Sequence, residues 1–494
     1  MIFINTCPDY LDREHVAFNP AYIPIGIGYL IEILKINGIT SHCIDQQIDS
    51  NVLKSIRKLT PQLSSPYIFG FSVMTGAYKN AINLSLKIKS IYPDSVIIFG
   101  GIHPTALPQE VLENKHIDIV VRGEGENIIT ELYNCVKNKR SFNHIDNISY
   151  VKNGGVFHNK QVLINDINEL PIFPYSLFKS KKYDLGFTMS SRGCPYDCVF
   201  CSSKIMNHGR LRCRSTEIII QELTNLYSQH NLKHVFFIDE NFLANHKRVI
   251  ELVEAIKNSE FYNKMFFSFL ARGDNISDDI LKLLYGAGFR TVFIGIETAS
   301  ERLMKIINKG ETTKQVLDAI ELAKNNGFLV ATTFIFGLPE ETKADRMISI
   351  NLIKTINVDF IKINNAVPYP GTNLFNIAKK EKSLFVKGMY ENFYSMSILL
   401  QNPFKKNNFP YLPVQNSEIC IRRDIFKAYS AFYLNPKRFK NHFSKVSVFT
   451  SLGYSFAYIF YVAPKIIITM LIVLVNIFGF FIKYIFHKPS KCTI

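Results

Sequence analysis

A run of three cysteines within eight residues constrains this chain more than any other feature. The run reads Cys194-Pro-Tyr-Asp-Cys198-Val-Phe-Cys201 and follows an apolar segment, 185–190, that we expect to be a β-strand. Three thiolates on one short loop can bind a metal, so the fold must gather them at the end of a strand. The alternative is a coincidental set of loop cysteines, which the tight spacing disfavours.

The identity of the metal follows from the number of ligands. Zinc usually takes four ligands, and the nearest candidates for a fourth are His208 and Cys213, so a zinc site stays open. An iron–sulfur cluster held by three thiolates leaves one iron free for another ligand, and we favour this interpretation. The nine cysteines are odd in number and unevenly spaced, which makes a secreted disulfide framework improbable.

The length of 494 residues predicts several domains, and 47% hydrophobic with 20% charged residues excludes a disordered chain. Residues 1–165 alternate short apolar runs with helical patterns, which predicts a doubly wound parallel sheet in an α/β domain. Glycines fall where the strands are expected to end, at the edge where such sheets bind ligands; ordinary turn glycines are the alternative. The predicted strands are 1–6, 41–45, 67–73, 95–100 and 117–121, and the predicted helices are 25–37, 76–91 and 126–138.

A proline-containing stretch, 166–184, is predicted to be a linker. Residues 185–385 then alternate strands and helices six times, which predicts an open, partial (β/α)6 barrel with its chemistry at the carboxyl ends of the strands. The predicted strands are 185–190, 234–238, 266–271, 291–296, 330–336 and 358–364. The predicted helices are 216–229, 246–258, 277–286, 300–307, 313–326 and 341–354.

The C-terminal region, 386–494, differs in composition and is expected to be mainly helical. Of a net charge of +16, most lies in residues 401–494, which hold thirteen Lys or Arg and two acidic residues. The same region contains apolar runs at 449–463 and 466–482. Basic flanks around an apolar run indicate an anionic membrane surface, so we expect a membrane-associated segment near 449–486, in a hairpin or lying in the interface. A helix packed on the barrel in a dimer is the alternative.

With its aromatic residue before the third cysteine, the run resembles the radical S-adenosylmethionine (SAM) superfamily, in which three cysteines hold a [4Fe–4S] cluster and the open iron binds SAM. The six βα units agree with the partial barrel of that family. The resemblance implies SAM contacts at the ends of successive strands. The residues are Asp239 and Glu240 for the amino group, Arg272 and Glu297 for the carboxylate and ribose, and Ile335 and Gly337 in the segment near adenine.

Simpler roles for these charged residues stay open. Arg272 and Glu297 could form a buried salt bridge, because ion pairs are common in barrels. Asp239 and Glu240 could cap the next helix.

The first domain is similar to the cobalamin-binding domain that precedes the barrel in B12-dependent radical SAM enzymes. The resemblance rests on Pro24-Ile-Gly-Ile-Gly28, Ser72-Val-Met-Thr-Gly76, Gly100-Gly-Ile-His-Pro-Thr105 and Val121-Arg-Gly-Glu-Gly-Glu126. No Asp-x-His-x-x-Gly motif occurs, so we expect no protein histidine on cobalt; a domain that has lost the corrin is the alternative. The implied cobalamin region comprises Met74, Thr75, Gly76, Gly100, Gly101, His103, Pro104, Thr105 and Glu124.

The resemblance implies a cobalamin-dependent radical SAM enzyme, and we expect a C-methyltransferase acting on an unactivated carbon of a small or lipophilic metabolite. The alternatives are a radical SAM cyclase or rearrangement enzyme and, in a different class, a non-catalytic membrane-tethered binding protein. The implied partners are a substrate, a reductant such as a flavodoxin or ferredoxin, and the inner face of the cytoplasmic membrane, with no nucleic acid. The sequence identifies no catalytic side chain.

Overall fold

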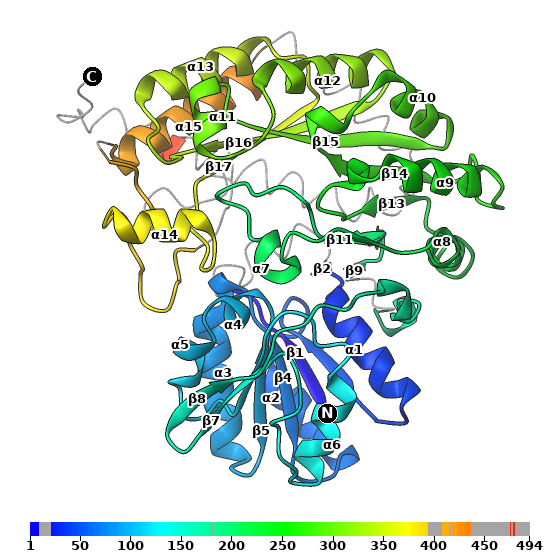
Figure 1. The fold of residues 1–494 in the computed structure, drawn as a ribbon, viewed down its shortest axis with the longest axis vertical. Helices are drawn as coiled ribbons and strands as arrows, with labels where there is room; N and C mark the ends of the chain where they lie inside the picture. The colour runs from blue at the N-terminus through cyan, green and yellow to red at the C-terminus, as the bar shows by residue number, and fades with distance from the viewer. Residues whose placement is uncertain are drawn as a thin grey trace.

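The computed structural model describes residues 1–8, 21–178, 182–393, 408–414, 416–433, 435, 475, 478 and 479. It has an α/β architecture with two largely parallel sheets, one in each half of the chain (Figure 1). The N-terminal sheet lies beneath the second sheet in the view of Figure 1, and the helices Asp278–Gly286, Thr313–Asn325 and Lys343–Thr355 lie on the side of that sheet turned away from the first domain.

The N-terminal sheet has the strand order β3-β1-β4-β5-β6-β7-β8. The first five of these strands are parallel, whereas β7 and β8 form an antiparallel hairpin that was not predicted. Apolar runs such as Val-Ile-Ile-Phe-Gly become strands because helices cover both faces of a parallel sheet. The strands are β1 (Ile2–Asn5), β3 (His42–Asp45), β4 (Ile68–Ser72), β5 (Val96–Gly100), β6 (Ile119–Val121), β7 (Ile148–Lys152) and β8 (Gly155–His158).

The helices of this half include the three predicted and three shorter ones that the sequence analysis missed. Val52–Leu59 was missed although it is strongly amphipathic, because it has only two full turns. The helices are α1 (Ile25–Ile36), α2 (Val52–Leu59), α3 (Tyr78–Ile91), α4 (Ile102–Ala106), α5 (Pro108–Leu112) and α6 (Ile129–Lys137).

The second sheet is the predicted six-stranded partial barrel, with the parallel order β10-β13-β14-β15-β16-β17. Its strands are β10 (Phe187–Thr188), β13 (His234–Phe237), β14 (Phe266–Ala271), β15 (Phe289–Glu297), β16 (Leu329–Phe336) and β17 (Phe360–Asn365). A separate antiparallel pair, β11 (Ser191–Arg192) with β12 (Arg212–Cys213), frames the cysteine loop. The register of β15 on β16 shifts between Gly295 and Glu297, at the carboxyl end of the sheet.

The barrel helices from Thr216 onward begin at side-chain caps that their sequences supply. Thr312 and Gln315 form a capping box at α12, for example, and Asn245 caps α9. The helices are α7 (Ser203–Asn207), α8 (Thr216–His230), α9 (His246–Lys257), α10 (Asp278–Gly286), α11 (Glu301–Ile306), α12 (Thr313–Asn325), α13 (Lys343–Thr355) and α14 (Asn373–Lys380).

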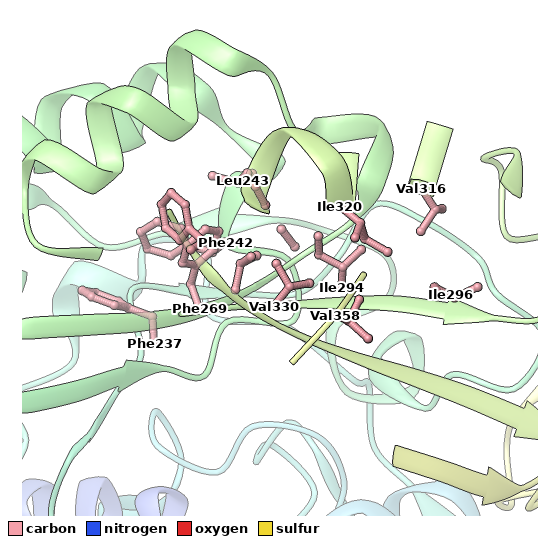
Figure 2. Packing of buried hydrophobic residues seen from close by; sticks show 14 of the residues in the cluster. Phe237, Phe242, Leu243, Phe269, Ile294, Ile296, Val316, Ile320, Val330 and Val358 are labelled. Atoms are coloured by element: carbon pink, nitrogen blue, oxygen red, sulfur yellow. The ribbon is translucent and has the colours of Figure 1, made fainter. Parts of the chain in front are cut away.

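The largest hydrophobic core lies between the barrel strands and these helices. Figure 2 shows Phe237, Phe242 and Phe269 packed together at one end of this core, with Ile294 and Ile320 farther along it. The phenylalanine rings pack at centroid distances near 5 Å, such as 4.9 Å for Phe237–Phe242. Such close packing makes the sheet a rigid platform for the loops at its carboxyl end.

The segment predicted to be a linker is part of the barrel core. Ile167, Leu170, Phe173 and Phe178 are buried and belong to the barrel cluster. Phe173 also packs on α1 of the first domain, where a Cβ on Gly28 would lie 2.4 Å from its ring. The absence of a helical period in this segment therefore did not mean the absence of packing.

The C-terminal region is described in part. Helix α15 (Glu418–Tyr433) packs on α13 and β17, and its Tyr429 hydroxyl is bonded to the backbone of Ile363. Within the described ranges, no helix combines the length and apolar composition needed to cross a bilayer. The predicted membrane-associated segment near 449–486 lies outside the described residues, apart from positions 475, 478 and 479.

Candidate functional site

The cysteine loop leaves β11 through a glycine that no other residue could replace without strain. Gly193 has φ +92°, and a Cβ there would lie 2.1 Å from the carbonyl oxygen of Arg210. Cys194 and Cys198 are half-buried, whereas Cys201 is exposed. The backbone N–H of Cys201 donates to the carbonyl of Cys198 at 3.0 Å, which closes a turn. The loop thus carries all three thiols at the carboxyl edge of the barrel.

The chemistry of this donor set fits an iron–sulfur cluster better than zinc. Among the residues that the structure describes, no group of three or more His, Cys, Asp or Glu is arranged to hold a single metal ion. In the part of the chain that the structure describes, His208 and Cys213 do not join the three cysteines in such a group. A four-iron cluster binds each thiolate at a different iron, so its ligands stand farther apart than those of one ion. Burial raises the pKa of the Cys198 thiol, but Lys309 and Arg272 oppose that rise and favour thiolate.

Asp239 follows β13 and is completely buried. Its carboxylate accepts hydrogen bonds from the backbone N–H of Ser190 at 3.2 Å, from the Ser190 hydroxyl at 2.8 Å and from the Ser191 hydroxyl. These bonds fix the chain just before the cysteine loop. In this arrangement Asp239 braces the loop rather than presenting a free carboxylate.

Glu240 is exposed and lies against the cysteine loop. Its carboxylate accepts from the N–H of Gly193 at 3.1 Å, from Ser203 at 3.2 Å and from Asn207 at 3.1 Å. The helix-capping alternative is wrong for both carboxylates, because Asn245 caps α9. Glu240 is thus a negative group beside the cysteines that a cationic amino group could approach.

Arg272 follows β14 and contacts the cysteine loop directly. Its guanidinium lies 3.5 Å from the ring centroid of Tyr196, and its Nη1 is 4.0 Å from the sulfur of Cys198. Two hydrogen bonds to Asp274, at 3.0 and 2.9 Å, hold the guanidinium in place. Burial alone would lower its pKa, but Asp274 and Glu311 raise it, so Arg272 is a fixed cation.

Glu297 ends β15 with φ +64°, a conformation uncommon for a residue with a side chain. The Arg272–Glu297 salt bridge, weighed as an alternative, does not form. Glu297 instead accepts from Lys309 at 3.4 Å and from Thr333 at 3.2 Å. Lys309 also lies 3.4 Å from Glu311, which is 4.0 Å from Arg272. The strand ends are therefore joined by a continuous line of alternating charges.

The segment after β16 is fixed by a buried carboxylate. The N–H of Gly337, at φ +83°, donates to Glu341 at 2.6 Å. Burial raises the pKa of Glu341 to about 8, although Arg346 opposes the rise. Arg346 in turn bonds Asp424 on α15 at 2.9 Å. The half-buried Ile335 lies on β16 just before this segment.

In the first domain, the loops after β4, β5 and β6 are hydrogen-bonded to one another. Gly101 has φ +98°, and a Cβ there would lie 2.9 Å from backbone atoms of Val73. The N–H of Gly123 donates to the Thr105 hydroxyl at 2.8 Å. Met74 is exposed at this edge, and Gly76, Gly100 and Gly101 are half-buried. A backbone surface with so few side chains fits a large flat ligand such as a corrin.

Some residues of the implied cobalamin region face inward. Thr75, Pro104 and Thr105 are buried, and His103 has no exposed surface. The centroid of the His103 ring lies 4.2 Å from that of Tyr78 and 5.0 Å from that of Tyr390, and neither nitrogen is bonded to a group of the described residues. Burial lowers its pKa to about 3. A ring in this position supplies no ligand at the loop surface.

Glu124 has a different environment from the one implied. Its carboxylate is buried and pairs with Arg192 and Arg212 of the second half, at 2.7 Å each. It contacts arginines beside the cysteine loop, and one of its oxygens also accepts from the N–H of Ile164 at 2.8 Å. Glu124 thus forms a contact between the two halves of the chain, and its assignment to the cobalamin region stays a prediction.

Several charged and polar residues that the fold brings to this site were not predicted from the sequence. A local signal existed in Asn308-Lys309-Gly310-Glu311, a polar tetrapeptide between α11 and α12, but nothing in it indicated Arg272 as a neighbour. The two arginines paired with Glu124 carried no signal of their own. The missed residues are Glu126, Arg192, Tyr196, Asn207, Arg212, Asp274, Lys309, Glu311 and Glu341.

Comparison with protein families matches both halves. The B12 binding domain matches residues 17–133 and the radical SAM superfamily matches residues 188–353. The chain is 31% identical over 428 residues to an uncharacterized methyltransferase of Pyrococcus horikoshii, covering 84% of this chain and 88% of the relative. It is 26% identical over 443 residues to the anaerobic magnesium-protoporphyrin IX monomethyl ester cyclase of Rubrivivax gelatinosus, covering 85% and 76%.

Solved structures share the fold. The radical SAM methyltransferase TsrM of Kitasatospora setae, solved with cobalamin and a [4Fe–4S] cluster, aligns with a TM-score of 0.69 at 16% identity, covering 88% of this chain and 89% of that one. The cobalamin-dependent SAM radical enzyme OxsB, solved with aqua-cobalamin and SAM, aligns with a TM-score of 0.69 at 18% identity, covering 90% and 70%.

Proposed function

Because the chain belongs to the radical SAM enzymes that carry a B12-binding domain, we propose that it transfers a methyl group from SAM to an unactivated carbon of a small or lipophilic metabolite. One observation carries the proposal: the strand-end loops of the two sheets meet. Arg192, two residues before Cys194, is paired with Glu124 and Glu126 of the first domain at 2.7 and 2.6 Å. Cofactors held by the two edges would therefore face a common space.

The residues that would hold each cofactor follow from the site. The thiols of Cys194, Cys198 and Cys201 would hold the cluster, with Glu240 and Arg272 beside it. The loops that contain Met74, Gly76, Gly100 and Gly101 would hold the corrin. When bound, the cluster supplies one-electron cleavage of SAM and the corrin supplies methyl transfer. The protein orients SAM by charge, because the amino group needs an acceptor and the carboxylate needs a cation.

The charge arrangement suits this division of roles. Glu240 presents negative charge, and Arg272, held by Asp274, presents positive charge. Lys309 lies 3.4 Å from Glu297 and holds its carboxylate in place. Preorganised charges of this kind bind a zwitterion in one orientation, which is what directs a reactive radical to one carbon.

The test is product stoichiometry under anoxic conditions. The reconstituted protein is given methyl-labelled SAM, a reductant such as flavodoxin or ferredoxin, and lipid or metabolite extracts. Methylation at carbon consumes two SAM and two electrons, and it releases S-adenosylhomocysteine, methionine and 5′-deoxyadenosine for each methylated product. Label in the product with equal amounts of both nucleosides supports the proposal. Deoxyadenosine without S-adenosylhomocysteine supports cyclisation instead, which similarity to the cyclase over 85% of this chain favours as the second candidate.

The C-terminal region supports a further part of the proposal, attachment to the cytoplasmic face of the membrane. The support is the apolar run 466–482 with lysines on both sides. Detergent-free fractionation of broken cells tests it, with the chain ending at residue 435 as the control. Recovery of both forms in the soluble fraction would exclude attachment.

A further inference from the structure

Two carboxylates of the first domain hold an arginine that stands just before the cysteine loop. Arg192 donates through Nη1 to Glu124 at 2.7 Å and through Nη2 to Glu126 at 2.6 Å. The side chains are 12%, 5% and 6% exposed, so both ion pairs are shielded from water. Arg192 stands immediately before Gly193, where the cysteine loop begins. The loop is therefore anchored from outside its own domain.

The same contacts continue to the carboxylate beside the cysteines. The second oxygen of Glu124 accepts from Arg212, whose other nitrogen donates to Asn207 at 2.9 Å. Asn207 donates to Glu240 at 3.1 Å, and Glu240 accepts from the N–H of Gly193, also at 3.1 Å. An unbroken series of hydrogen bonds thus runs from the loop after β6 to Glu240 and back to the cysteine loop.

Stability alone does not account for this arrangement. A buried ion pair seldom stabilises a protein more than packed apolar residues of similar size, but it fixes one geometry. The guanidinium of Arg192 donates to the two glutamates through separate nitrogens, and this fixes its orientation. The two residues that gain most from a fixed Arg192 and Arg212 are Gly193 and Glu240, both at the cluster edge.

We propose that Glu124 and Glu126 are positioning residues for SAM binding. Through Arg192, Arg212 and Asn207 they hold the cysteine loop and Glu240 in the geometry that receives SAM. Docking of the corrin-binding domain and SAM affinity are thereby coupled. The inference rests on the proposed function only for the identity of the ligand, SAM.

The test compares Glu126→Gln with Glu131→Gln in the full-length, reconstituted protein. Glu131 lies in the same domain, and its pair with His144 is exposed, so it is a matched control. We expect Glu126→Gln to raise the dissociation constant for SAM about 10- to 100-fold, by analogy with the loss of partners that orient metal ligands. Iron content should stay at the level of the control. Deuterium uptake of peptides covering residues 190–207 should increase in the cofactor-free protein.

A double-mutant cycle separates positioning from general weakening. Arg192→Gln and Glu126→Gln both remove the Arg192–Glu126 contact. The dissociation constant of the double variant for SAM should therefore be no higher than that of the single variant that binds SAM less tightly. Arg192→Lys keeps the positive charge but lacks the forked guanidinium, and it tests the inference if Glu126→Gln does not fold. We expect its dissociation constant for SAM to lie between those of the unmodified protein and Arg192→Gln. Additive losses in the cycle, or SAM affinity in Glu126→Gln equal to that of Glu131→Gln, would overturn the inference. Tight SAM binding without methyl transfer would instead count against the proposed function alone.

Discussion

The two parallel sheets of this protein end in opposite kinds of chemistry. The barrel strands end in thiols and charges, from Glu240 through Arg272 to Glu297, joined by Lys309 and Glu311. The loops after β4 and β5 of the first domain present Gly76, Gly100 and Gly101, with the exposed Met74 beside them. The difference teaches that a similar architecture can select a small charged ligand by electrostatics or a large flat ligand by shape.

Removing a thiol should have the largest effect on the barrel edge. We expect Cys198→Ala to abolish SAM cleavage and to lower iron from about four atoms per chain toward zero, since three thiolates are needed to hold the cluster. Corrin binding at the other edge should persist. Iron and corrin analysis after anoxic reconstitution measures both. Cys213→Ala serves as the control and should retain iron. Loss of iron in Cys213→Ala would indicate that Cys213 is a ligand.

Neutralising Lys309 tests whether the barrel edge depends on balanced charge. Lys309→Met leaves Glu297 buried without its lysine and leaves Glu311 with Arg272 at 4.0 Å, which should lower the free energy of unfolding by about 3–5 kcal/mol. Lys314→Met removes an exposed pair with Asp318 in the same domain, and it should cost less than about 1 kcal/mol. Denaturant unfolding compares them. Equal losses of unfolding free energy in the two variants would mean that the buried charges stabilise the protein no more than an exposed ion pair does.

Adding a methyl group to Gly101 tests whether the other edge depends on shape. Gly101→Ala forces a side chain into φ +98° and against the backbone of Val73, so we expect a loss of about 3 kcal/mol in stability and weaker corrin binding. Gly154 has φ +76° with open space around it, so Gly154→Ala isolates the backbone strain. Thermal unfolding and corrin titration provide the measurements. Unchanged corrin affinity in Gly101→Ala would contradict a close backbone contact.

A smaller effect should appear in acid, in the first domain. The folded pKa of His103 is about 3, below its ordinary value of 6.5. The contribution of the neutral His103 to the free energy of unfolding is therefore complete above pH 6.5 and declines as the pH falls toward 3. Lowering the pH from 7 to 5 should cost about 2 kcal/mol through this group. His103→Phe should lose that pH dependence, whereas the exposed His144→Phe should retain it; parallel pH profiles for His103→Phe and the unmodified protein would exclude this role.

Much of the fold could be predicted from local sequence patterns. The predicted strand 266–271 coincides with β14, and the six barrel helices begin within two residues of their predicted starts. Strands and helix starts can be predicted in this way because apolar periodicity and helix caps depend on residues close together in the sequence. The β7–β8 hairpin and the short helix α2 were missed, because both are brief. The supposed linker was misjudged, because burial of residues such as Phe173 depends on a partner, α1, far away in the sequence.

The site shows the same division. The sequence by itself determined the chemical types: three thiols at one strand end, carboxylates and an arginine at the next ends, and glycines in the first domain. Only the tertiary structure decided the partners. Arg272 pairs with Asp274 and not with Glu297, and Glu124 contacts Arg192 across the domain boundary. The physical reason is that a motif reflects bonding within a few residues, whereas ion pairs form between whichever charges the packing of two sheets brings within a few ångströms.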